Sequence, residues 1–275
     1  MYKIFINIAS YRDPDLVNTI EDAYDKAKNP DNIFIGVSEQ DDSHNNKLDS
    51  YRNIKYTFRH FSKSKGTGWH RNEINKNLYE GEDFSLTIDS HSRFKKNWDT
   101  TYIEKYLSFE ENIVLTGFPP HFDFEESYDT YTGMREINTF NVPKNITEES
   151  LIQGIGEHCE EEFKETVVVS GANIFSTGMF NQLSTYNHYL HPFLDQEIIC
   201  CLAFMYNHKV IYSKEALVWH CYRNNLPGSE EKYRRLVSED VQLSGYDRDI
   251  VKYFDTFNSP KKASQWKKYI LNYKL

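Results

Sequence analysis

Hydrophobic and polar residues alternate at the start of the chain and then change to a helical spacing, which predicts a strand followed by an amphipathic helix. The alternation covers residues 3–9. The apolar positions of the helix, spaced by four, three and four residues, are Leu16, Ile20, Ala23 and Ala27. We expect Asp13 to cap this helix, Pro14 to take its first position, and the helix to end near Asn29.

Similar patterns follow along the first half of the chain. They predict strands at residues 33–38, 53–60 and 84–89 and helices at residues 69–79 and 98–107. A strand–helix–strand opening is typical of the first half of a nucleotide-binding α/β domain. Polar residues at the strand ends, 10–13 and 40–42, would meet at one edge of the sheet, either as a binding site or as ordinary solvated loops.

The second half is less regular. A strand is predicted at residues 112–116, and periodicity is poor over residues 121–165, where we expect an extended insertion or a set of long loops that forms one wall of a binding site. The acidic run within that segment reads as a solvated face. Further predictions are a strand from residue 167, a small-residue turn at 170–173, a helix from 194, strands at 209–212 and 216–219, and a helical tail from about 229.

The predicted strand at residues 84–89 stops at Asp89, and His91 follows two residues later. In an extended chain, residues i and i+2 point to the same side, so these two side chains can converge on one ion. A carboxylate oxygen with an imidazole nitrogen suits Mn²⁺ or Zn²⁺ better than Mg²⁺. The alternative is a surface turn in which Asp89 caps the backbone, and that is the commoner meaning of an isolated Asp-x-His.

Composition and charge exclude several classes of protein. A chain of 275 residues with 39% hydrophobic residues can bury a core as one large domain, with or without a small appendage. The net charge of −9 argues against a nonspecific nucleic-acid binder. No apolar run approaches the length of a membrane span, and the start of the chain lacks the pattern of a signal peptide. Four irregularly spaced cysteines favour reduced thiols and a cytoplasmic location.

Several stretches, taken in order, resemble one known family. The stretches are Ile8-Ala9-Ser10-Tyr11-Arg12-Asp13-Pro14, Gly66 to Arg71, Tyr79 to Phe84, Ile88-Asp89-Ser90-His91-Ser92-Arg93-Phe94, Trp98-Asp99, Gly171-Ala172, Asp195-Gln196-Glu197 and His220-Cys221-Tyr222-Arg223. They are similar to motifs of the polypeptide α-N-acetylglucosaminyltransferases related to the cytoplasmic enzyme that glycosylates hydroxyproline. The block from Ile88 to Phe94 is the most specific of them.

The resemblance implies an α/β fold of the GT-A glycosyltransferase type, in which a Rossmann-like nucleotide-binding sheet joins a less regular acceptor-binding half. We therefore expect a GT-A domain over residues 1–225, with a nucleotide-sugar half at 1–117 and an acceptor half at 118–225. Residues 226–275 would form a C-terminal helical extension. The resemblance also implies a divalent cation, usually Mn²⁺, and a UDP-sugar donor.

The same resemblance implies roles for particular residues. The metal ligands would be Asp89, His91 and His220. The UDP-sugar would be contacted by Ser10, Tyr11, Arg12, Gln40, Arg71 and Ser90. The catalytic set would be Glu197 near the acceptor, Asp89 and Arg223. The family usually has two consecutive acidic residues where this chain has Gln196-Glu197, which weakens the assignment of the acceptor.

The expected function is thus metal-dependent transfer of a sugar, with GlcNAc first, from a UDP-sugar to a hydroxyl acceptor on a protein or glycan, with retention of configuration. No residue is an obvious covalent nucleophile, which favours attack by the acceptor on the face from which UDP leaves. Two alternatives remain open from the sequence. One is a metal-dependent hydrolase of a nucleotide or phosphoester, and the other is a non-catalytic carbohydrate- or protein-binding module on a decayed transferase fold.

Overall fold

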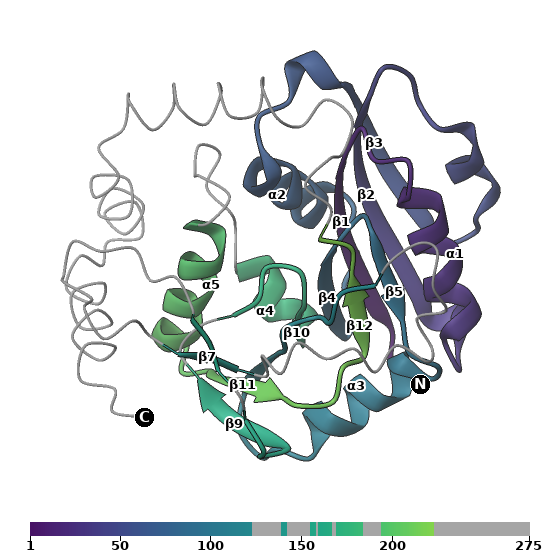
Figure 1. Cartoon of the computed structure of the whole chain (residues 1–275). Coiled ribbons are helices and arrows are strands. Elements are labelled where there is room, and N and C mark those ends of the chain that lie inside the picture. The colour runs from purple at the N-terminus through teal and green to yellow at the C-terminus, as the bar shows by residue number, and fades with distance from the viewer. Residues whose placement is uncertain (123–138, 142–154, 158, 167–168, 184–193, 223–275) are drawn as a thin grey trace, which may run out of the picture.

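The computed structural model describes residues 1–122, 139–141, 155–157, 159–166, 169–183 and 194–222 (Figure 1). Its main feature is an eight-stranded sheet with the strand order β3-β2-β1-β4-β10-β6-β11-β9. The strands are β1 (Ile4–Tyr11), β2 (Ile33–Asp41), β3 (Ile54–His60), β4 (Phe84–Asp89), β6 (Ile113–Thr116), β9 (Phe163–Thr166), β10 (Ile174–Thr177) and β11 (Lys209–Ser213). Strands from both expected halves of the GT-A domain thus share one sheet.

The first four strands of the chain run parallel to one another, whereas the rest of the sheet is mixed. In register, Ile4 pairs with Ile33 of β2 on one side and with Phe84 of β4 on the other. β10 is antiparallel to both β4 and β6, and β9 is antiparallel to β11. Because parallel strands end at the same edge, the carboxyl ends of β1, β2 and β4 meet there, where open α/β sheets bind ligands.

Helices cover both faces of the sheet. The helices are α1 (Leu16–Lys26), α2 (Thr67–Asn77), α3 (Trp98–Leu107), α4 (Gly178–Leu183) and α5 (Leu194–Met205). Alternate residues of β1 point to opposite faces, so Ile6 belongs to the core cluster that includes α1 and α3, whereas Phe5 packs against Ile74 of α2. A Cβ on Gly36 would lie 2.5 Å from the ring of Phe5. Glycine is therefore required where α2 approaches the sheet.

Two small sheets lie apart from the main one. β5 (Ser92–Phe94) pairs antiparallel with β12 (Val218–His220), and β7 (Thr139–Asn141) pairs antiparallel with β8 (Ile155–Glu157). Figure 1 shows β5 and β12 side by side in front of the central strands. The sequence pattern does not reveal the strand β5, because it is short and every one of its residues is buried.

Within the described residues, the periodic segments form the predicted elements, and differences arise at the start of α1 and at β9. α1 begins at Leu16 with Asp15 in the capping position, so the prediction of Asp13 as the cap is wrong. The carboxylate of Asp13 instead accepts hydrogen bonds from the backbone of Asp15 and from two side chains after β4. β9 was not predicted and overlaps the acidic run of residues 157–165 that was expected to be a solvated face. Residues 167–168, where the next strand was predicted to begin, lie outside the described residues. The predicted tail from residue 229 lies outside the described residues.

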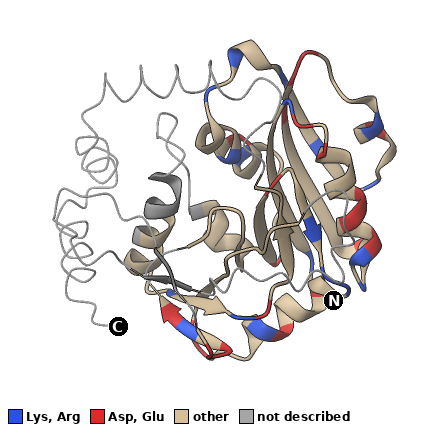
Figure 2. Ribbon diagram, in the orientation of Figure 1, with Lys and Arg blue, Asp and Glu red and all other residues tan. Residues whose placement is uncertain are grey.

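Charged side chains lie on the outer helices, loops and edge strands, and the central strands are almost free of them (Figure 2). In the part of the chain that the structure describes, no helix combines the length and the apolar character needed to cross a membrane.

Candidate functional site

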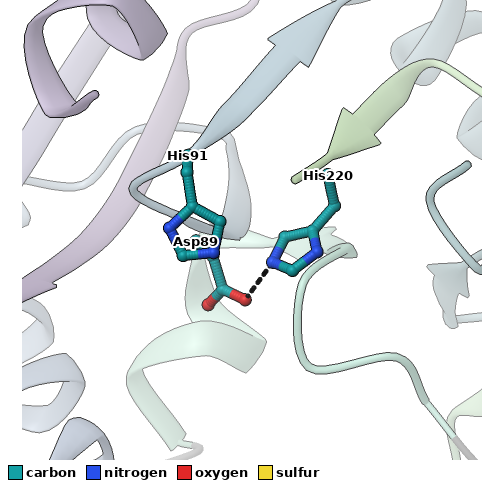
Figure 3. A group of neighbouring side chains, drawn as sticks. All are labelled: Asp89, His91 and His220. Carbon is teal, nitrogen blue, oxygen red and sulfur yellow. Dashed lines mark hydrogen bonds and ion pairs between the residues drawn. The ribbon is translucent and has the colours of Figure 1, made fainter. Parts of the chain in front are cut away.

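Three side chains converge at the carboxyl end of β4. Asp89 is the last residue of β4, and His91 lies in the turn that leads into β5. β12 pairs with β5 so that His220 lies opposite Ser92, which brings it beside Asp89 although 131 residues separate the two. One potential ligand atom from each of Asp89, His91 and His220 lies within 4.8 Å of the others (Figure 3). These are the three residues that the sequence analysis expects to hold a metal.

Both carboxylate oxygens of Asp89 accept hydrogen bonds. His220 Nε2 lies 2.9 Å from Oδ2, and the Arg71 guanidinium lies 2.9 Å from Oδ1. Arg71 also donates to the carbonyl oxygen of Gly171, at 2.9 Å. Burial raises the pKa of Asp89, but the hydrogen bond from His220 and the positive charges nearby outweigh it and hold the pKa well below its usual range. Asp89 therefore remains ionised at neutral pH.

His91 is held by a second carboxylate. Its Nδ1 lies 2.7 Å from Oδ2 of Asp13, whose side chain is 1% exposed. Burial lowers the pKa of His91, and the hydrogen bond to Asp13 with the charges of Asp89 and Asp13 raises it above its usual value overall. Burial raises the pKa of Asp13, and the interactions with His91 and Ser90 lower it below its usual value overall. In Figure 3, one ring nitrogen of His91 lies on the side of Asp89 and His220.

The chemistry of these three side chains fits a divalent cation. One carboxylate oxygen and two imidazole nitrogens are ligands typical of Mn²⁺ and Zn²⁺, whereas Mg²⁺ prefers oxygen ligands and water. The side chain of Asp89 is 32% exposed, so the group can be reached from solvent. Among the described residues, no other group of at least three such side chains converges in this way.

Arg12, expected on the donor side, is held where β1 and β2 end. Its φ of 48° lies in the left-handed region, which bulky residues rarely adopt and which is enriched at ligand sites. Its backbone N–H donates to the carbonyl of Gln40 at 2.8 Å, and its guanidinium forms an ion pair with Asp42 at 3.0 Å. The guanidinium also lies 4.4 Å from the ring centroid of Phe61, against which the ring of Tyr11 packs edge-on. Both Tyr11 and Arg12 therefore belong to one cluster.

The remaining donor-side residues make internal contacts. The Gln40 amide donates to the carbonyl of Ser10 at 3.0 Å and accepts from the hydroxyl of Ser64, so both ends of this side chain bind protein. The hydroxyl of Ser90 donates to the carboxylate of Asp13. Gln40 and Ser90 are both buried. Their side chains support the surrounding loops in this arrangement.

Two of the expected catalytic residues are not placed. Glu197 belongs to α5, which contacts β11, but its side chain lies outside the described part of the structure. Arg223 falls outside the described residues altogether.

Two residues that were not predicted to belong to the site lie beside it. Asp13 contacts His91, and Thr19 of α1 hydrogen-bonds to the backbone on both sides of His91. Asp13 stands in the Ser10–Pro14 motif, but a helix cap is the usual reason for an aspartate before Pro, so the local signal pointed elsewhere. No sequence pattern marks Thr19 as part of the site, because its hydrogen-bond partners lie 71 and 73 residues away in the chain.

Comparison with solved structures shows which known fold this arrangement matches. The chain is similar to the crystal structure of GalNAc-T7 with UDP, GalNAc and Mn²⁺, at 13% identity and a TM-score of 0.60, over 88% of this chain and 48% of that one. It is also similar to S. aureus TarS 1–349 in complex with UDP-GlcNAc, at 15% identity and a TM-score of 0.51, over 87% and 66% of the two chains.

A third similar structure is the mannosyltransferase PcManGT from Pyrobaculum calidifontis in complex with GDP-Man and Mn²⁺, at 9% identity and a TM-score of 0.52, over 82% and 58% of the two chains. The chain thus spans about half to two thirds of the length of these structures. At these identities the likeness shows the fold, which is GT-A.

Among curated proteins, none matches the chain in sequence. The model of the family described as Glycosyltransferase (GlcNAc) matches residues 3–57 and 47–245, which together cover most of the chain. The chain therefore belongs to the Glycosyltransferase (GlcNAc) family.

Proposed function

We propose that this chain is a metal-dependent glycosyltransferase that transfers GlcNAc from UDP-GlcNAc to a hydroxyl group of a protein or glycan. The observation that carries the proposal is the convergence of Asp89, His91 and His220 at the carboxyl end of β4, in a chain of this family. These three residues would hold a divalent cation, with Mn²⁺ as the first candidate. When bound, such a cation stabilises the negative charge that develops on the leaving diphosphate.

The residues around the cation site have separate proposed tasks. Arg71 keeps Asp89 ionised and fixes its carboxylate, because its guanidinium bonds both Asp89 and the backbone of Gly171. Ser10, Tyr11 and Arg12 would bind the uridine at the end of β1. Gln40 and Ser90 would act on the donor side mainly by holding the loops that line it, since their polar groups bind Ser10 and Asp13.

Support for the donor comes from the family and from one neighbour that was crystallised with UDP-GlcNAc. Support for the acceptor comes from the resemblance to the enzymes that modify hydroxyproline, so a hydroxylated peptide is the first acceptor to test. Glu197 would lie near that acceptor, and Arg223 would add hydrogen bonds to the diphosphate. The buried free cysteines and the same resemblance favour the cytoplasm as the compartment.

We further infer that the sugar keeps its anomeric configuration. The acceptor hydroxyl would attack the sugar carbon on the face from which UDP departs, with no covalent sugar–enzyme intermediate. A sugar attached to a carboxylate such as Glu197, trapped and seen by mass spectrometry of the intact protein, would contradict this mechanism.

The test is a donor screen with the purified protein and Mn²⁺, in which each UDP-sugar is supplied in turn and UDP release is measured. We expect release from UDP-GlcNAc that is lost in EDTA and falls at least about 100-fold in Asp89→Ala, because the charge stabilisation is removed. His220→Gln should lose activity similarly while leaving the Asp89–Arg71 ion pair intact. Transfer to a peptide, followed by mass spectrometry, separates a transferase from a hydrolase. No release and no UDP binding by calorimetry would overturn the proposal.

A further inference from the structure

Asp13 is a buried carboxylate whose two oxygens accept three hydrogen bonds. Oδ1 accepts from the backbone N–H of Asp15 at 2.9 Å. Oδ2 accepts from the hydroxyl of Ser90 and from His91 Nδ1, the latter at 2.7 Å. A carboxylate that is 1% exposed is costly to desolvate unless it is hydrogen-bonded, and both oxygens of Asp13 accept hydrogen bonds. The contacts with Ser90 and His91 tie the loop after β1 to the turn after β4, whereas the contact with Asp15 lies within that loop.

The contact with His91 has a consequence for the other nitrogen of the ring. Because Nδ1 gives its proton to a hydrogen bond with Asp13, the neutral ring presents the lone pair of Nε2. Figure 3 shows that this second nitrogen lies on the side of Asp89 and His220. Histidine ligands of metals commonly donate their other ring N–H to a carboxylate, which fixes both the tautomer and the orientation of the ring.

We propose that Asp13 is a positioning residue for the metal site, which fixes the tautomer and orientation of His91 through its Nδ1. The inference rests on the proposed function, because it takes Asp89, His91 and His220 as the metal ligands. Asp13 itself does not face the cation. It acts through His91, and it links the donor-binding end of β1 to the metal-binding turn.

The chain offers a matched comparison for a role that is only structural. Thr19 is fully buried on α1, and its hydroxyl lies 2.7 Å from the carbonyl of Ser90 and 2.9 Å from the backbone nitrogen of Ser92. Thr19 therefore anchors the same turn on both sides of His91 without a hydrogen bond to the imidazole. If Asp13 only fastens the turn, removing either anchor should affect metal binding equally.

The experiment measures Mn²⁺ affinity by electron paramagnetic resonance, without nucleotide, for the wild type, Asp13→Ala and Thr19→Ala. We expect Asp13→Ala to weaken Mn²⁺ binding about 10- to 100-fold, the range seen when outer-shell partners of ligands are removed. Thr19→Ala should change it less than about threefold. Equal losses in the two variants would overturn the inference. Thermal unfolding without metal checks that both variants fold.

A second measurement needs no variant of Asp13. Long-range ¹H–¹⁵N spectra of the metal-free wild type, at a pH where the His91 ring is neutral, should show the proton on Nδ1, with His91→Gln identifying the signals. The opposite tautomer, with the proton on Nε2, would overturn the inference. If the wild type binds no Mn²⁺, the proposed metal site and the inference about Asp13 are both wrong. If the wild type binds Mn²⁺ and the two alanine variants weaken it alike, only the role of Asp13 fails.

Discussion

Two buried polar residues show how burial and hydrogen-bond partners determine the state of a single side chain. Arg71 is 3% exposed, and one of its nitrogens bonds both the Asp89 carboxylate and the backbone of Gly171. His70 is the opposite case: it is fully buried beside the sheet and must stay neutral.

His70 should make the protein less stable in mild acid. Burial, and secondarily the charges of Arg59 and Lys65, lower the pKa of His70 to about 3 from its ordinary 6.5. His70 therefore takes up a proton near pH 6.5 in the unfolded chain but only near pH 3 in the folded chain. Its contribution to the unfolding free energy is complete above pH 6.5 and is lost progressively as the pH falls toward 3. Between pH 7 and pH 5 this single group should cost about 2 kcal/mol of unfolding free energy.

The measurement is urea denaturation of the wild type and His70→Gln at both pH values. The variant should lose less stability on going from pH 7 to pH 5, because glutamine does not titrate. His60→Gln is the matched control, since His60 lies at the end of β3 with 46% of its side chain exposed. This variant should lose as much stability between pH 7 and pH 5 as the wild type. If all three proteins lost the same unfolding free energy between pH 7 and pH 5, His70 would have to take up its proton in the folded state, and the prediction would be wrong.

At the scale of elements, α1 has two buried sides rather than one. Leu16, Ile20 and Ala23 face the core, as the apolar spacing predicts. Its polar residues do not all face solvent, however. Thr19 binds the backbone around Ser90, and Asp22 accepts a hydrogen bond from the backbone of Phe94 at 2.6 Å. The helix thus holds the turn that carries His91, and β5, in place as well as covering the sheet.

The close approach of α2 to the sheet should be sensitive to a single methyl group. A Cβ at Gly36 would lie 2.5 Å from the Phe5 ring and 2.7 Å from a methyl group of Ile74. We expect Gly36→Ala to lower the unfolding free energy by about 1–3 kcal/mol through overpacking, as measured by urea denaturation.

A double mutant separates this overpacking from other causes. Ile74→Ala alone should cost about 2–5 kcal/mol, because it opens a cavity in a fully buried site. In the Gly36→Ala background it should cost less, since it also relieves the clash. If the two losses of unfolding free energy were strictly additive, the side chains at positions 36 and 74 would not be in steric conflict.

At the scale of the whole molecule, the sheet gathers the site from distant parts of the chain. The ends of β1, β2 and β4 supply Asp89 and the residues proposed to bind the donor, and the pairing of β5 with β12 adds His220. A ligand that bridges these parts should stabilise the folded chain, because it binds the folded state and not the unfolded one.

Mn²⁺ with UDP, at about 100 times the dissociation constant, should stabilise the wild type by about 2.7 kcal/mol. That corresponds to a rise of about 5–10 °C in Tm for a chain of this size, followed by differential scanning fluorimetry. Asp89→Ala should show little rise above its own ligand-free Tm, which is the correct reference because the variant also removes the ion pair between Asp89 and Arg71. Glu111→Ala is the control: it removes an exposed partner of Lys209 and should keep the full rise. An equal rise in Asp89→Ala would contradict the proposed metal site.

The sequence by itself determined the elements whose signal is local. β1, α1, β2, β3, α2, β4 and α3 all have a periodicity that reports which residues of a single segment are buried. The same pattern marked Asp89 and His91, because residues two apart at the end of a strand share a side. The role of His220 as a metal ligand came from the family motifs, by resemblance.

The strands β5 and β10, and the contacts between distant segments, depend on the tertiary structure. β5 and β10 are too short to show a period, and they are strands because neighbouring strands satisfy their backbone groups. His220 reaches Asp89 across 131 residues because β12 pairs with β5. Asp13 meets His91 across 78 residues because β1 and β4 end at the same edge of the sheet. A hydrogen bond between distant segments depends on where the whole sheet places them, and no local pattern of residues carries that information.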